Sequence, residues 1–187
     1  IKAKSSTEDG FKLDLEALDA SIRNQTRLLI LNSPCNPTGR LIPREEMEAI
    51  AEIVRKHPNL LVMSDEIYEY LIDDHLTHYS FGAIAPDLSE RVFTVNGFAK
   101  GWAMTGWRVG YLSGNKQVVK AAAALQSHST SNVCSFAQRG ALAAIQGPKK
   151  CVQEMASRYN IRLKLLTKKL HEIEGIELVS PNSAFYA

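Results

Sequence analysis

Short apolar segments alternate with longer amphipathic segments through most of this sequence, and this alternation restricts the fold more than any other feature. The apolar runs end at turn residues and have the length of buried strands. We expect four of them to be strands, at Leu28–Leu31, Leu60–Met63, Val92–Val95 and Val109–Leu112. Buried strands separated by helices pack as a mostly parallel sheet covered on both faces, so the sequence predicts an α/β fold.

The longer segments between these runs carry the signals of helices. Residues 43–56 begin with Pro43, place two glutamates in the first turn and repeat apolar residues at helical spacing. Residues 117–126 and 131–145 have a similar apolar spacing. The basic segment 149–173 is predicted as one long helix, and a solvated helix face explains its charge better than a nucleic-acid site does.

A Gly147-Pro148 pair interrupts the alternation and predicts a domain boundary. We expect residues 1–147 to form a large domain, and residues 148–187 to contain the long helix and the start of a smaller α/β domain. In that second part, Ile176–Val179 is predicted as a strand. The first residues lack the apolar stretch of a signal peptide, so we expect the chain to be cut from a longer protein, with both ends missing.

Composition and charge argue against several functional classes. The formal net charge of +2 is too small to indicate binding to nucleic acid or to an anionic membrane surface. No apolar run approaches the roughly 18 residues that a membrane-spanning helix needs. Three cysteines without a C-x-x-C spacing are typical of free thiols in a reducing compartment, the cytoplasm or a plant plastid. The aspartates and histidines of segment 73–78 match no ligand pattern, so we expect a solvated loop and no metal site.

Two polar segments follow predicted strands, at the sheet edge where ligands bind in open α/β folds. The N-P-T-G sequence Asn36–Gly39 follows the first strand, although these residue types are also typical of a simple turn. Ser64–Tyr68 follows the second strand, where Asp65 either binds a ligand or caps a short helix. Each segment alone leaves both interpretations open.

Segment 96–110 contains a lysine and an arginine among apolar residues. Lys100 is flanked by phenylalanine, alanine, tryptophan and methionine, which argues against a solvated surface lysine. Partial desolvation favours the free amine, and a free amine can form a Schiff base. Arg108 also has apolar neighbours and should need an anionic partner, and its planar fork of donors suits a phosphate.

Taken in order, N-P-T-G, S-D-E-I-Y and F-A-K-G-W-A-M-T-G-W-R-V-G-Y resemble the fold-type I pyridoxal-phosphate (PLP) enzymes, and within them the class I/II aminotransferases. The last motif is the most specific, because Arg108 follows Lys100 by eight residues (108 − 100) inside T-G-W-R. The resemblance covers essentially the whole chain and is closest to the type Ib aspartate and prephenate aminotransferases. It implies a three-layer, mostly parallel sheet in a large PLP-binding domain, followed by a smaller domain.

The resemblance also implies catalytic roles. Lys100 would bind PLP as a Schiff base and then act as the acid–base catalyst, Asp65 would pair with the pyridine nitrogen, and Tyr68 would hydrogen-bond the phenolic oxygen. The substrates would be an amino acid, with aspartate or glutamate expected, and a 2-oxo acid, used in a ping-pong cycle by a homodimer. Two alternatives stay open: another PLP reaction, such as C–S lysis or aminocyclopropane-carboxylate synthesis, and an effector domain of a transcription regulator.

Three further residues would hold the cofactor. Asn36 would hydrogen-bond the phenolic oxygen, Arg108 would bind the phosphate, and Ile67 would pack against one face of the ring. Two positions depart from patterns found in the family. Gly97 stands where many relatives have a phosphate-binding serine, although the type Ib subgroup also has glycine there, and Ser183 replaces the glycine of P-x-G-A-F-Y. We expect the second change to alter the local geometry on the substrate side.

Overall fold

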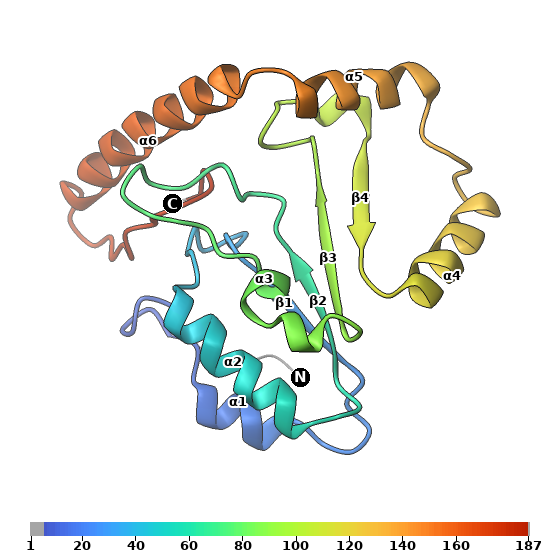
Figure 1. Cartoon of the computed structure of the whole chain (residues 1–187). Coiled ribbons are helices and arrows are strands. Elements are labelled where there is room, and N and C mark those ends of the chain that lie inside the picture. The colour runs from blue at the N-terminus through green and yellow to red at the C-terminus, as the bar shows by residue number, and fades with distance from the viewer. Residues whose placement is uncertain (1–5, 187) are drawn as a thin grey trace.

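The computed structural model describes residues 6–186; residues 1–5, at the start of the predicted large domain, and Ala187 lie outside the described residues. One mixed, mostly parallel sheet of four strands lies at the centre, in the order β1-β2-β3-β4 (Figure 1). β4 runs antiparallel to β3, and the other neighbours are parallel. In chain order the strands are β1 (Leu28–Asn32), β2 (Leu61–Asp65), β3 (Val92–Gly97) and β4 (Gly110–Ser113).

Helices occupy much of the remaining described chain. They are α1 (Leu15–Ser21), α2 (Arg44–Lys56), α3 (Phe81–Ile84), α4 (Lys116–Ser127), α5 (Ser135–Gln146) and α6 (Lys150–His171). Two short 3-10 helices precede β3 and β4, namely η1 (Pro86–Leu88) and η2 (Thr105–Trp107). Each of the predicted strands within the sheet is present, with its ends close to the predicted residues, whereas α1 and α3 were not predicted.

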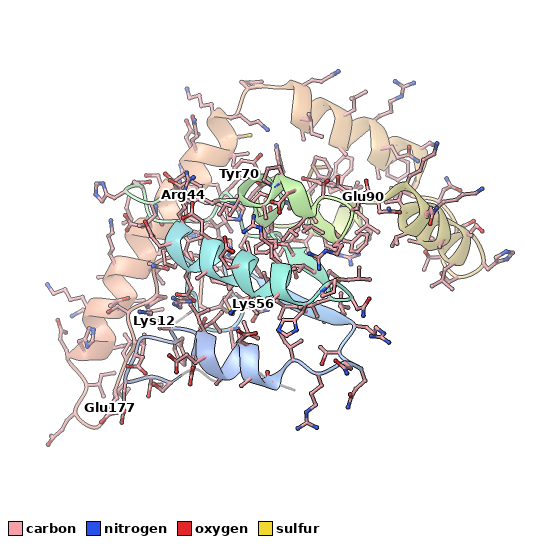
Figure 2. All side chains as sticks on the ribbon, turned by 60° about the horizontal axis from the view of Figure 1, so that its bottom comes forward. Lys12, Arg44, Lys56, Tyr70, Glu90 and Glu177 are labelled. Carbon is pink, nitrogen blue, oxygen red and sulfur yellow. The ribbon has the colours of Figure 1, made fainter. Side chains whose placement is uncertain are left out.

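α2 shows why this sequence folds as it does. Glutamates lie in its first turn and Arg55 and Lys56 in its last turn, where they oppose the partial charges of the helix dipole. Lys56, labelled in Figure 2, forms an ion pair with Asp19 of α1. The apolar face of α2 packs with α1, α3 and the sheet in the main core. That core includes Leu31, Met47, Ile50, Val54, Val62, Phe81 and Val92.

At β1, helices cover only one face of the sheet. Leu29 and Leu31 pack into the main core. Leu28 and Ile30, which alternate with them, are 44% and 60% exposed. We predicted that helices cover both faces of the sheet. Within residues 6–186 they cover only one face of β1.

α6 is attached to the loop that follows β2. The buried Asn160 donates from Nδ2 to the backbone oxygen of Ile72 and to Asp74 Oδ1, each at 3.0 Å. The chain then returns to this loop, where Ser183 forms an isolated antiparallel bridge with Ile72. The prediction of a strand at Ile176–Val179 is wrong, because a strand needs a neighbour to complete its hydrogen bonds and this segment has none within residues 6–186. None of the described helices is both long and apolar enough to cross a membrane.

Candidate active site

The sheet topology brings four predicted site residues to one edge. Asn36 follows β1, Asp65 ends β2 and Lys100 follows β3. Because these three strands are parallel, their carboxyl ends share an edge. Arg108 precedes β4, and the antiparallel pairing of β4 with β3 places the start of β4 at that same edge (Figure 1).

Lys100 lies against aromatic side chains. Its Nζ is 5.5 Å from the centre of the Tyr68 ring and 5.3 Å from the centre of the Phe185 ring. An ammonium group at this distance is attracted to the π-face of a ring. No salt bridge within residues 6–186 involves Lys100. The side chain is therefore partly buried, as the sequence predicted, and it has no acidic partner in the described chain.

Tyr68 is the most buried of the predicted site residues, at 3% exposed. Its hydroxyl oxygen lies 2.6 Å from that of Tyr186. The rings of Phe185 and Tyr186 pack edge-on against it, with centroids 5.5 and 5.8 Å away. Burial raises the pKa of Tyr186 above its ordinary value, and the hydrogen bond with Tyr68 raises it further. No sequence motif indicates this contact of Tyr186, because it joins residues 118 positions apart.

Asn32, the last residue of β1, joins the Asp65 and Asn36 segments. Its Nδ2 donates to the backbone oxygen of Asp65 at 3.2 Å, and its Oδ1 accepts from the backbone N–H of Asn36 at 2.8 Å. The Asp65 carboxylate accepts from the backbone N–H of Ile67 at 3.2 Å. Asn36 itself is exposed, and Ile67 packs in the cluster around Tyr68. Asn32 thus holds the two segments together, and no sequence motif indicated it.

The apolar sequence neighbours of Arg108 do not bury its side chain. Arg108 is exposed, and its neighbour Trp107 is 45% exposed. The guanidinium donates from Nη1 to the backbone oxygen of Thr105 at 2.9 Å. No salt bridge within residues 6–186 involves Arg108. The anionic partner that the sequence predicted is therefore not a side chain of the described residues.

The C-terminal segment is held on the N-P-T-G turn. The backbone oxygen of Gly39 accepts from the N–H groups of Asn182 and Ser183, at 3.0 and 2.9 Å, and from Ser183 Oγ at 2.8 Å. Gly39 has φ +63°, and a Cβ there would lie 2.5 Å from Pro181 Cβ, so only glycine fits. Ser183 is 1% exposed. The pattern P-x-G-A-F-Y has glycine at this position, so the Ser183 hydroxyl and its hydrogen bond are the local change in this sequence.

Aromatic side chains support the turn that carries Lys100. Tyr70, labelled in Figure 2, packs on Gly101, where an added Cβ would lie 2.6 Å from Tyr70 Cδ2. The Tyr70 and Trp102 ring centroids are 4.8 Å apart. Lys149 Nζ lies 4.4 Å from the centre of the Trp102 ring, so the packing continues to the start of α6. Burial raises the pKa of Tyr70, which keeps its hydroxyl protonated at neutral pH.

The acidic residues of segment 73–78 have structural partners. Asp73 forms an ion pair with Lys164 of α6 at 3.0 Å, which lowers the pKa of that carboxyl below its usual range. Asp74 accepts from Asn160. Residues 6–186 contain no group of three or more histidine, cysteine or acidic side chains that could hold a metal ion.

Comparison with known proteins decides the family. The profile described as "Aminotransferase class I and II" matches residues 1–187. The chain belongs to the class I and II aminotransferases. A "Probable aspartate/prephenate aminotransferase" of Rickettsia felis is 45% identical over 179 residues, which are 96% of this chain and 44% of the relative. An "Aspartate aminotransferase" of Pinus pinaster is 45% identical over 181 residues, covering 95% of this chain and 37% of the relative.

A solved structure agrees with the fold. The aspartate aminotransferase from Thermus thermophilus with maleate is 38% identical to this chain, with a TM-score of 0.91 over 98% of this chain and 47% of the other. The chain therefore spans less than half the length of each of these three relatives. The match covers the sheet and the edge that carries the predicted site residues.

The family uses PLP, and the residues at this edge fit that group chemically. The amine of Lys100, without an acidic partner in residues 6–186, can bond to an aldehyde. The carboxylate of Asp65 suits a protonated pyridine nitrogen. The exposed guanidinium of Arg108, which has no acidic partner in the same residues, suits a phosphate. An amine, an acid and a guanidinium at one edge match the aldehyde, ring nitrogen and phosphate of this cofactor.

Proposed function

We propose that this chain carries the cofactor-binding core of an aminotransferase that moves an amino group between an amino acid and a 2-oxo acid. The position of the Lys100 amine supports this most strongly. It lies at the carboxyl edge of the sheet, over the rings of Tyr68 and Phe185, without an acidic partner in residues 6–186. No acidic side chain of residues 6–186 holds this group in an ion pair, so its neutral amine can attack a carbonyl carbon.

Four other side chains would bind the cofactor. When bound, PLP supplies a conjugated ring that withdraws electrons from the substrate Cα. The Asp65 carboxylate would keep the ring nitrogen protonated. Tyr68 and Asn36 would donate hydrogen bonds to the phenolic oxygen and so stabilise its negative charge. Arg108 would bind the phosphate with its fork of donors.

Lys100 would have two successive tasks. It would first hold the cofactor covalently through Nζ. Its free amine would then act as the acid–base catalyst that takes the proton from the substrate Cα. Ile67, which packs beside Tyr68, would contact one face of the ring and hold its plane.

Aspartate or glutamate is the amino donor that we propose, because the Rickettsia and pine relatives carry aspartate in their names. We further propose that the whole protein is a homodimer whose large domain includes residues 1–147, with a second domain beginning in residues 148–187. In that protein a third layer would cover the face of β1 where Ile30 is 60% exposed, because a solvated apolar sheet face is unfavourable.

Product analysis tests this function. The protein at its natural length is incubated with PLP, aspartate or glutamate, and a 2-oxo acid. We expect one new amino acid for each donor consumed. Without a 2-oxo acid, we expect at most one 2-oxo acid released per Lys100, because the amino group stays on the enzyme. Continuous release of ammonia without an acceptor would instead identify an eliminating enzyme.

A further inference from the structure

The hydroxyl groups of Tyr68 and Tyr186 form a close pair at the candidate site. Their oxygens are 2.6 Å apart, and the geometry allows either to donate. Tyr68 is 3% exposed, so water has little access to its ring. Tyr186 comes from the C-terminal segment, which is held by hydrogen bonds from Ser183 and Asn182 to Gly39. The pair therefore joins the loop after β2 to the C-terminal segment, which also bonds to that loop through the Ala184 N–H and the Leu71 oxygen.

The number of hydrogens determines which phenol donates. A tyrosine hydroxyl has one hydrogen and two lone pairs. In the function proposed above, the hydrogen of Tyr68 is directed to the phenolic oxygen of PLP. The bond between the two phenols must then use the hydrogen of Tyr186. Burial raises the pKa of Tyr186, and the hydrogen bond with Tyr68 adds to this effect, so Tyr186 retains that hydrogen at neutral pH.

We propose that Tyr186 is a positioning residue: it donates to the Tyr68 oxygen and thereby directs the Tyr68 hydrogen toward the cofactor. This inference rests on the proposed function. A donor whose own oxygen accepts a hydrogen bond is polarised and donates more strongly. Tyr186 would therefore act through Tyr68 to stabilise the negative charge on the phenolic oxygen, and so to lower the pKa of the imine that Lys100 forms.

Tyr159 provides a matched control. Its ring stacks on Phe185, with centroids 5.4 Å apart, so it belongs to the same aromatic cluster as Tyr186. Its hydroxyl makes no hydrogen bond to Tyr68, whose hydroxyl is paired with Tyr186. Y186F and Y159F each remove one hydroxyl from the cluster and keep the ring. Only Y186F removes the hydrogen bond to Tyr68.

The experiment is a pH titration of the visible absorbance band of the PLP-bound protein at its natural length. In Y186F we expect the pKa of this band to rise by about half a pH unit to one pH unit, as for the loss of one hydrogen bond. In Y159F we expect no change. We also expect kcat/KM in Y186F to fall by about threefold to tenfold. A packing role alone would leave the pKa of the band unchanged.

A second measurement uses the cofactor-free protein. Proton NMR of the tyrosine hydroxyls should show the shared hydrogen in the wild type and in Y159F, and not in Y186F. A band pKa that is unchanged in Y186F, or shifted equally in Y159F, would overturn the inference. A wild-type protein without any visible band would overturn the proposed function as well, while the NMR signal would still show whether the two phenols are paired.

Discussion

Gly97 and Gly110 face each other across β3 and β4, and the strands leave no room for a side chain on Gly97. A Cβ on Gly97 would lie 2.8 Å from the Gly110 Cα and 2.8 Å from the backbone oxygen of Val109. A serine at this position therefore does not fit without moving β4. Because only Val109 separates Arg108 from β4, the close contact of the two glycines also constrains the backbone position of Arg108.

Substitution of Gly97 by alanine tests this contact. We expect Gly97→Ala to lower the free energy of unfolding by about 1–3 kcal/mol, because the added methyl group forces β3 and β4 apart. Gly106→Ala is the control, since a Cβ on Gly106 has nothing within 4 Å. Urea denaturation of both variants measures the difference. Equal stability of the two variants would show that β4 can move to accommodate the methyl group without lowering the free energy of unfolding.

Lys100→Ala should abolish the visible, pH-sensitive band of the PLP-bound protein, because no other amine would then hold the aldehyde. Lys149→Ala is the matched control, because this lysine is also near the site but packs on Trp102. Absorbance spectra with added PLP measure both variants. A covalent PLP adduct in Lys100→Ala that can be reduced with borohydride would show that another lysine holds the cofactor.

Local pattern was sufficient to predict the sheet, and it was insufficient where a segment depends on distant partners. The strands around Ile30, Val62 and Val95 were predicted because each is a short run of apolar residues. α5 begins at Ser135 instead of residue 131, since Ser131 has a left-handed φ of 61° that interrupts the helix. Ile176–Val179 has strand-like residues but no described neighbour to pair with.

Asp65→Ala should retain PLP and lose most transamination. The truncated side chain leaves the ring nitrogen without its anion, and loss of a charge-assisted hydrogen bond of about 1.5–3 kcal/mol lowers kcat by roughly tenfold to a hundredfold. Asp87→Asn serves as control, because Asp87 pairs with Arg55 on the surface. Steady-state kinetics at saturating PLP measure the effect. A kcat within about twofold of wild type would contradict the role of Asp65.

In the candidate site too, some residues could be predicted from local sequence patterns and others could not. Asn36, Asp65 and Lys100 could be predicted to share an edge, because the carboxyl ends of parallel strands meet there. Asn32 and Tyr186 could not, because their contacts join residues 33 and 118 positions apart. The first contact depends on the register of β1 and β2, and the second on the path by which the C-terminal segment returns to the site; no local spacing encodes either.

Glu69 should give stability a pH dependence. Burial raises the pKa of its carboxyl above 4.5, although the hydrogen bond from Asn96 acts in the opposite direction. The folded state therefore binds this proton more tightly than the unfolded state, so stability falls as the pH rises from 4.5 through the raised pKa. Glu69→Gln removes the ionisation, and we expect it to gain stability relative to wild type over that range.

The gain from Glu69→Gln should be small, below about 1 kcal/mol, because the carboxyl is only partly buried and solvent screens it. Urea denaturation at about pH 4 and about pH 7 measures it. We expect the two proteins to differ more at the higher pH. A larger difference at the lower pH would mean that the hydrogen bond from Asn96 outweighs burial.

Ser183 is the position at which this chain departs from P-x-G-A-F-Y, and its hydroxyl can be tested directly. Ser183→Ala should lower the free energy of unfolding by about 0.5–1.5 kcal/mol, because a buried hydrogen bond to the Gly39 oxygen is lost. The loss stays moderate because two backbone N–H groups still bond to that oxygen. Ser183→Gly should be less stable by about another 0.5–1 kcal/mol, since glycine has more freedom in the unfolded chain.

The control for Ser183 is Ser127→Ala, which removes an exposed hydroxyl bonded within its own helix to the Ala124 oxygen. We expect that variant to lie within about 0.5 kcal/mol of wild type. Hydrogen exchange at the Ala184 amide, which donates to the Leu71 oxygen, should become faster in Ser183→Ala and stay unchanged in Ser127→Ala. Equal exchange at Ala184 in both variants would mean that the backbone bonds alone hold the C-terminal segment on the N-P-T-G turn.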